Sequence, residues 1–193
     1  MTILGLPDFR SVLGGRAARE LAEHEKWAAV AMLLREGASG PEVFFIRRAE
    51  HPRDPWSGHM AFPGGRQDAG DATLLHTAMR ETHEEVGFDL SREAEHIGQL
   101  DDLQAIARGK AQETVIRPFV FEVHSESPIR VDETEVAEAL WTPLLPLYRG
   151  EVDTVRPYQW HGTEIDFPAY DVGGRAVWGL TYQMLRSFFR ILG

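Results

Sequence analysis

The sequence contains no cysteine, which excludes disulfide bonds, cysteine-ligated metal centres and a thiol nucleophile. Any metal site must therefore use oxygen or imidazole ligands. Positive charge is also scarce, because 20 Lys and Arg stand against 30 Asp and Glu and give a formal charge of −10. Such a chain repels polyanions, so we expect neither a nucleic acid nor an anionic membrane as its partner.

Long hydrophobic segments are lacking as well. The run from Ala28 to Leu34 is far too short to cross a bilayer. Residues 1–7 lack the basic start and the long apolar core of a signal peptide. These absences predict a soluble, cytoplasmic protein. The chain has 193 residues, of which 43% are apolar and 26% charged, and it shows no repeat or linker, so we expect a single domain over residues 1–193.

The apolar pattern and the turn signals predict strands on both sides of one central helix. Strands are expected at residues 27–34, 42–46, 60–62, 97–106 and 113–123, with a hairpin at 158–167. Pro118 suits an edge or a bulge better than a central position. Helices are expected within an N-terminal extension (1–26), at 71–88, at 133–140 and at 176–192. This order predicts an α+β fold, an α/β/α sandwich around a central mixed sheet.

The helix predicted at residues 71–88 has two different faces. Asp71 can cap its start, and Gly87 can end it in a left-handed conformation. At about 100° per residue, the apolar side chains lie in one sector and three acidic ones lie in another, namely Glu81, Glu84 and Glu85. We therefore expect one face to pack against the sheet and the other to concentrate carboxylates.

Three carboxylates at these spacings repel one another by a few tenths of a kcal/mol for each pair. Their position near the negative end of the helix dipole increases the repulsion. Converging carboxylate oxygens suit Mg²⁺ or Mn²⁺. The alternative is a solvated acidic face that Arg80 and surface cations neutralise.

Two glycines, Gly64 and Gly65, precede this helix and permit a tight turn whose N–H groups can meet a substrate. Together with residues 80–88, Arg-Glu-Thr-His-Glu-Glu-Val-Gly-Phe, this arrangement resembles the Nudix hydrolase box. Thr82 replaces the usual aliphatic residue. Gly65 precedes Arg80 by fifteen positions where the box has fourteen, and Asp68 or Asp71 can stand in for the absent glutamate between them.

The region upstream resembles the coenzyme A pyrophosphatase branch of that family. The resemblance rests on residues 44–49, Phe-Phe-Ile-Arg-Arg-Ala, on Arg53 and Gly58, and on the extra connector residue before the helix. Four residues separate Arg53 from Gly58 where the branch has three. The resemblance implies coenzyme A or a derivative as substrate. A nucleoside diphosphate sugar or a dinucleotide is the alternative, and a non-catalytic nucleotide-binding module is less favoured.

The resemblance also implies a Nudix-type sandwich fold and a role for each box residue in cutting a pyrophosphate bond with water. Glu81, Glu84 and Glu85 would hold Mg²⁺ or Mn²⁺, and Arg80 would orient and neutralise a glutamate of the box. Family members often take the general base from a later loop. Glu135 is the preferred candidate here, with Glu133 or Glu81 as alternatives. The competing interpretation places Glu133, Glu135 and Glu138 on a solvated helix face.

The phosphates need positive and backbone N–H partners. Arg47 and Arg53 are candidates to bind them, together with the backbone of Gly64 and Gly65. Because side chains alternate along a strand, at most one of Arg47 and Arg48 faces the site. Four tryptophans can stack an adenine, although core packing is the commoner role: Trp56, Trp141, Trp160 and Trp178. The aromatic terminal helix is expected to dock on the sheet and can also cover a homodimer seam.

Overall fold

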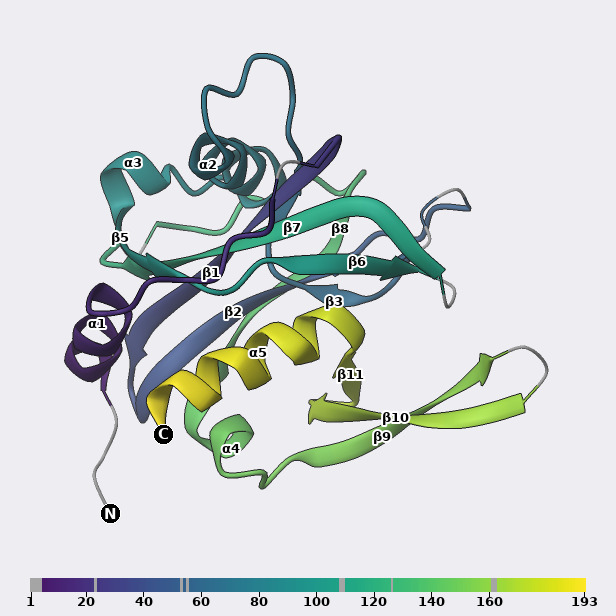
Figure 1. The fold of residues 1–193 in the computed structure, drawn as a ribbon. Coiled ribbons are helices and arrows are strands. Elements are labelled where there is room, and N and C mark those ends of the chain that lie inside the picture. Colours follow the sequence, from purple (N-terminus) through teal and green to yellow (C-terminus); the bar gives the residue numbers. More distant parts are fainter. Residues whose placement is uncertain are drawn as a thin grey trace.

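A computed structural model describes residues 5–22, 24–52, 54, 56–107, 110–125, 127–160 and 163–193. Within these residues, eight strands form a mixed sheet and three others form a second, antiparallel sheet. Helices α2 and α3 cover one face of the mixed sheet, and α1, α4, α5 and the second sheet lie on the other (Figure 1). The predicted α+β class and α/β/α sandwich are confirmed. The helices are α1 (Leu6–Gly14), α2 (Leu74–Val86), α3 (Leu90–Glu93), α4 (Leu144–Tyr148) and α5 (Gly179–Leu192).

The centre of the mixed sheet is the parallel pair of β1 (Lys26–Gly37) and β7 (Lys110–Val123). On its other side, β1 pairs with β2 (Gly40–Arg48) only near its end and with β4 (Gly64–Arg66) near its start. The strands β1 and β2 therefore diverge, and the short strands β3 (Met60–Ala61) and β4 fill the gap between them. This gap brings Gly64 and Gly65 beside α2. The remaining strands are β5 (Ala94–Gln99), β6 (Leu103–Ala107) and β8 (Val136–Pro143).

Two expected strand features are corrected near β7. The strand predicted at 97–106 is split into β5 and β6. The Leu100 N–H still donates to the Pro118 carbonyl of β7, but the Asp102 N–H donates to the Arg19 carbonyl instead of to β7. Pro118 itself lies in a strand that has partners on both sides, not at an edge. It occupies the break between β5 and β6, where a missing N–H leaves no ladder bond unmade.

The helix predicted at residues 133–140 is wrong. Residues 133–135 form a turn, and β8 follows and pairs with β2. Val136 is fully buried at the start of this strand. The pairing along the edge of the sheet outweighs the weak helical preference of the Glu and Ala residues.

The second sheet contains β9 (Asp153–Trp160), β10 (Thr163–Val172) and β11 (Arg175–Trp178). The hairpin predicted at 158–167 is confirmed as part of β9 and β10, with its turn at 161–162 outside the described residues. The terminal helix begins at Gly179 and not at residue 176, because residues 175–178 pair with β10 and bury Val177. Gly179 has φ +62° and turns the chain from strand to helix.

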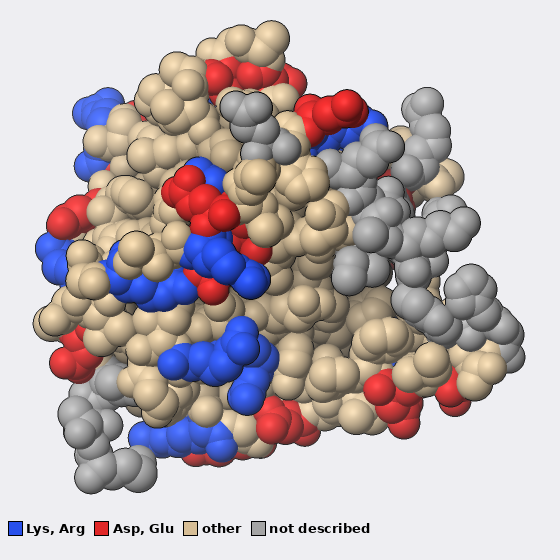
Figure 2. All heavy atoms as spheres, in the orientation of Figure 1, with Lys and Arg blue, Asp and Glu red and all other residues tan. Residues whose placement is uncertain are grey.

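Two hydrophobic cores lie on the two faces of the mixed sheet. The first joins α1 and α5 to the sheet and includes Phe9, Phe188 and Phe189, so the aromatic face of the terminal helix is buried within its own chain. The second lies under α2 and includes Phe44 and Phe88. Positive and negative side chains are mixed over the face seen in Figure 2, with no extended basic surface. In the described part of the chain, every helix is too short or too polar to cross a membrane.

Candidate active site

Helix α2 carries the acidic motif and is defined at both ends. Thr73, not Asp71, caps its start, and its side chain accepts a hydrogen bond from the His76 N–H at 3.2 Å. Asp71 lies two residues further out and is free to serve a different partner. Gly87 ends the helix at φ +79°, as expected, and its N–H donates to the His83 carbonyl.

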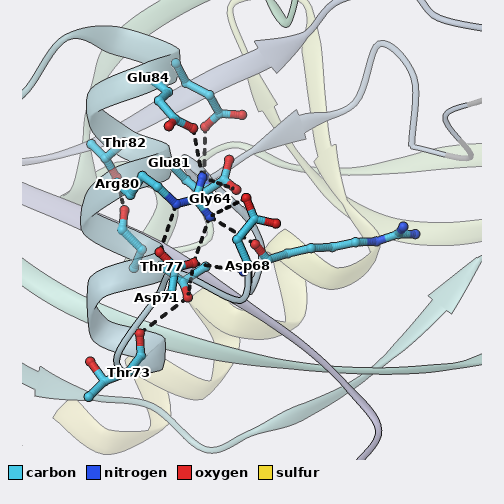
Figure 3. A network of polar contacts seen from close by, with 12 residues as sticks. Gly64, Asp68, Asp71, Thr73, Thr77, Arg80, Glu81, Thr82 and Glu84 are labelled. Atoms are coloured by element: carbon cyan, nitrogen blue, oxygen red, sulfur yellow. Dashed lines mark hydrogen bonds and ion pairs between the residues drawn. The ribbon is translucent and has the colours of Figure 1, made fainter.

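Asp71 and Arg80 form a clamp at the centre of the polar network in Figure 3. Two guanidinium nitrogens of Arg80 each donate to one Asp71 oxygen at 2.9 Å, and the Thr77 hydroxyl donates to the same carboxylate. This bidentate geometry leaves the third nitrogen of Arg80 for Glu84 at 2.8 Å and Glu81 at 3.0 Å. Asp71 thereby fixes the cation that lies between the two glutamates.

Replacing Asp71 with asparagine is expected to cost about 2 kcal/mol of stability or more and to lower activity about tenfold, because Arg80 loses its charged anchor. Arg80 holds the pKa of Asp71 well below its usual range. The stabilisation is therefore present above about pH 4 and is lost as the pH falls further. Urea unfolding at pH 7 and pH 3, with initial rates at pH 7, measures both effects.

Asp68 supplies the matched control for this prediction. Its side chain is 76% exposed and lies 4.0 Å from Arg80. We expect Asp68→Asn to change stability by no more than about 0.5 kcal/mol. Equal losses in the two variants would contradict the role assigned to Asp71.

Glu85 is buried, with 1% of its side chain exposed, although the helical pattern groups it with Glu81 and Glu84 on the acidic face and not on the packing face. It lies between α2 and β4, where the Gly64 N–H donates to one of its oxygens at 2.8 Å. Its other oxygen is 3.8 Å from Arg48. Burial, together with the nearby charges of Glu81 and Glu135, raises the pKa of Glu85 to about 8.

The two glycines before the helix allow carboxylates to approach the backbone. A Cβ atom at Gly64, which has φ +148°, would lie 2.3 Å from the Ala29 carbonyl oxygen. A Cβ atom at Gly65 would lie 2.5 Å from the Glu81 carboxylate. The expected phosphate-binding role is corrected for Gly64, because its N–H is already used by Glu85.

The remaining acidic candidates differ in their surroundings. The Glu81 side chain is 15% exposed and that of Glu84 is 57% exposed. Burial is the main effect that raises the pKa of Glu81, and the charges of Glu84 and Glu135 add to it. Glu135 is therefore near the box, in the turn before β8. Glu138 points away from the box, toward Arg175 of β11, with which it forms a two-bond ion pair.

A cleft of about 620 Å³ brings these groups together. Its lining combines the glutamates of α2 and Glu135 with apolar side chains such as Met60, Leu180 and Met184. Arg48, Asp54 and His59 also line it. Carboxylates, an arginine and apolar side chains in one cleft suit a ligand that is part anionic and part apolar.

Comparison with known proteins agrees with this geometry. The NUDIX domain family matches residues 25–161. The chain belongs to the Nudix hydrolase family. An uncharacterized protein of Schizosaccharomyces pombe, C14C4.10c, is 40% identical over 118 residues, which cover 60% of this chain. The chain spans only about a third of that protein's length, because the match covers 36% of it.

A second relative and a solved structure extend the comparison of this Nudix protein. The mitochondrial coenzyme A diphosphatase NUDT8 of Homo sapiens is 30% identical over 175 residues, which cover 89% of this chain and 71% of that protein. The Ap4A hydrolase of C. elegans, in a binary complex, superposes with a TM-score of 0.51 at 19% identity. That match covers 64% of this chain and 84% of the other and shows the shared fold.

The donor set of the Nudix box is suited to a divalent cation. Glu81 and Glu85 present hard oxygen ligands from a part-buried and a buried position, and a nearby cation would offset the burial of their charges. Among the residues that the structure describes, no three acidic or imidazole side chains form a ready cluster around one point. Arg80 lies between Glu81 and Glu84 and neutralises them instead.

The structure separates the three arginine candidates. Arg48 lines the cleft, pairs with Asp54 at 2.7 Å and approaches Glu85. Arg47 points to the opposite side of β2 and lies 3.5 Å from Glu138, so the expectation for Arg47 is corrected by strand alternation. Arg53 lies outside the described residues.

The tryptophan candidates are separated in the same way. Trp56 and Trp178 line the cleft. Trp141 packs against Phe44 and Phe88 in the core under α2. The side chain of Trp160 is outside the described part of the structure. Sequence reasoning favoured a surface or packing role for His59 over a substrate contact beside the glycine turn. It did not select Asp54, which lies in an irregular loop without a spacing pattern.

Proposed function

We propose that this Nudix protein hydrolyses a pyrophosphate bond in a nucleoside diphosphate linked to another moiety, with coenzyme A or a derivative as the preferred substrate. The observation that carries the proposal is the convergence of the box glutamates, Glu135 and Arg48 in one cleft. The similarity to a coenzyme A diphosphatase over 89% of this chain supports the choice of substrate.

Each residue has a distinct role in this proposal. Glu81, Glu84 and Glu85 would hold Mg²⁺ or Mn²⁺, which neutralises phosphate charge and makes water a stronger nucleophile when it is bound. Arg80, fixed by Asp71, orients Glu81 and Glu84. Arg48 is placed to bind a phosphate oxygen at the cleft.

Glu135 is the proposed general base, because it lines the cleft and its charge acts on both Glu81 and Glu85. Replacing it with glutamine removes the proton acceptor, so we expect kcat to fall about 100-fold or more with little change in KM. Glu133 lies two residues away and is absent from the cleft lining, which makes Glu133→Gln the matched control. An unchanged kcat in both variants would assign the role of general base to Glu81. A fall in kcat confined to Glu133→Gln would assign it to Glu133.

A substrate panel tests the proposed function. The protein is incubated with coenzyme A, ADP-ribose, a nucleoside diphosphate sugar and a diadenosine polyphosphate, each with Mg²⁺ or Mn²⁺, and products are separated by chromatography. Coenzyme A is expected to yield an adenosine bisphosphate and a phosphopantetheine product. Rapid cleavage of a sugar nucleotide or dinucleotide beside negligible coenzyme A turnover would reject the preferred substrate. Binding without any turnover would indicate a non-catalytic module.

A further inference from the structure

The cleft extends beyond the carboxylates to an aromatic wall built from four segments. Trp178, the last residue of β11, lines the cleft together with His59. Their rings are 4.8 Å apart and tilted by 53°. Tyr158 of β9 and Phe167 of β10 lie behind Trp178, with ring centres at 5.4 and 5.8 Å. The indole ring is thus supported from the second sheet while it also borders the catalytic cleft.

Arg156 completes this wall with a positive charge. Its guanidinium carbon is 5.6 Å from the centre of the Trp178 ring. Arg156 is exposed, and none of the carboxylates that the structure describes lies within ion-pair distance of it. Burial and the charge of Arg156 lower the pKa of His59, so the imidazole beside Trp178 is neutral near pH 7. The wall therefore combines a large π surface with one cation that has no acidic partner among the described residues.

We propose that Trp178 is the stacking platform for the nucleobase of the substrate and that Arg156, whose guanidinium lies over the Trp178 ring in the free protein, moves aside when the base binds and contacts its outer face or the adjacent phosphate. This inference rests on the proposed function and places the nucleoside half at the second sheet, with the pyrophosphate at the box. Aromatic rings and guanidinium planes are the groups on which proteins stack bases. The pantetheine arm has no aromatic ring, only two amides in an otherwise aliphatic chain, and it gains less from this surface.

Trp141 provides a matched comparison within the same chain. The Arg35 guanidinium carbon lies 4.2 Å from the centre of its ring, so it too is a tryptophan with an arginine over it. Trp141, however, packs against Phe44 and Phe88 and is absent from the catalytic cleft lining. A Trp141 variant therefore shows the general effect of losing a tryptophan that has an arginine over its ring, and an additional loss in a Trp178 variant reports base stacking.

The test compares AMP with ribose 5-phosphate, which differs only by the adenine, and with 4′-phosphopantetheine. Binding to the full chain is measured by calorimetry and by quenching of tryptophan fluorescence up to 10 mM ligand. The variants are Trp178→Leu, Trp178→Phe, Arg156→Ala and the control Trp141→Leu. Circular dichroism and thermal melts establish which variants are folded, and Trp178→Phe retains both bulk and a π face if the leucine variant does not fold.

We expect Trp178→Leu to weaken AMP binding about tenfold, which is the loss of one base–aromatic stack. Binding of ribose 5-phosphate and phosphopantetheine should not change. Trp178→Phe should retain most of the affinity and lose most of the fluorescence quenching. Arg156→Ala should weaken AMP binding severalfold, and Trp141→Leu should leave it unchanged.

Three results would overturn the inference: no AMP binding by the unmodified chain, equal AMP binding in the folded Trp178 variants, or a loss confined to phosphopantetheine. The substrate panel is run on the same preparations. Hydrolysis by the unmodified chain with an unchanged KM in the Trp178 variants rejects the base platform and leaves the proposed function standing. AMP binding that depends on Trp178 without hydrolysis of any substrate supports the base platform and rejects the proposed hydrolytic function.

Discussion

Replacing Glu85 with glutamine is expected to lower kcat/KM by about 1,000-fold or more while leaving the fold intact. Glutamine retains the shape and the oxygen that accepts the Gly64 N–H, but it removes the negative charge that would hold the cation. Loss of an anionic ligand costs several kcal/mol of transition-state stabilisation. Because burial disfavours the charged carboxylate, the free energy of unfolding without metal should stay the same or rise slightly.

Kinetics and thermal melts in parallel test this prediction. Mg²⁺ or Mn²⁺ should raise the Tm of the unmodified chain and have a much smaller effect on Glu85→Gln, because a ligand stabilises only the state that binds it. Glu84→Gln is a useful comparison, since Glu84 is 57% exposed and its loss should cost less activity. Unchanged turnover of Glu85→Gln at saturating Mg²⁺ would refute the assignment of Glu85 as a ligand.

Substituting the two adjacent glycines with alanine is expected to have different consequences. Gly64→Ala should destabilise the fold by about 3 kcal/mol or more, because φ is +148° and the new Cβ would meet the backbone of Ala29 and Val30 at 2.3 and 2.5 Å. Gly65→Ala should keep the fold and lower activity about 100-fold. The three atoms nearest to its Cβ all belong to the end of the Glu81 side chain, which can rotate away and leave the proposed cation site.

Urea unfolding and initial rates on both variants separate these effects. Gly70→Ala is the matched control, because a Cβ atom there meets nothing within 4 Å, and we expect it to change neither quantity. Unfolding of Gly64→Ala at the urea concentration of the unmodified chain would contradict the backbone contact. Full activity in Gly65→Ala would show that Glu81 does not need its present position.

The local pattern of the sequence was sufficient for the central helix and the sandwich class. The Arg80 to Phe88 motif and the left-handed turn at Gly87 depend on residues close together in the chain, so their spacing predicts both the helix and its ending. Strand pairing between β1 and β2 follows from the short Gly-containing turn between two apolar runs. The same local pattern carries the resemblance to the Nudix box.

Local reasoning failed where a partner distant in sequence decides the structure. Residues 136–143 form a strand because they pair with the free edge of β2. Residues 175–178 form a strand because they pair with β10. Glu85 lies on the nominally polar face of α2, yet β4 covers it. No periodicity within the helix contains that information.

The sequence by itself therefore determined the family, the acidic helix and the sheet-and-helix class, because each rests on the order and spacing of neighbouring residues. Only the tertiary structure decided that Arg48 and not Arg47 faces the cleft, that the Gly64 N–H donates to Glu85, and that Trp178 lines the cleft. These choices arise from strand alternation and from close packing between segments far apart in the chain.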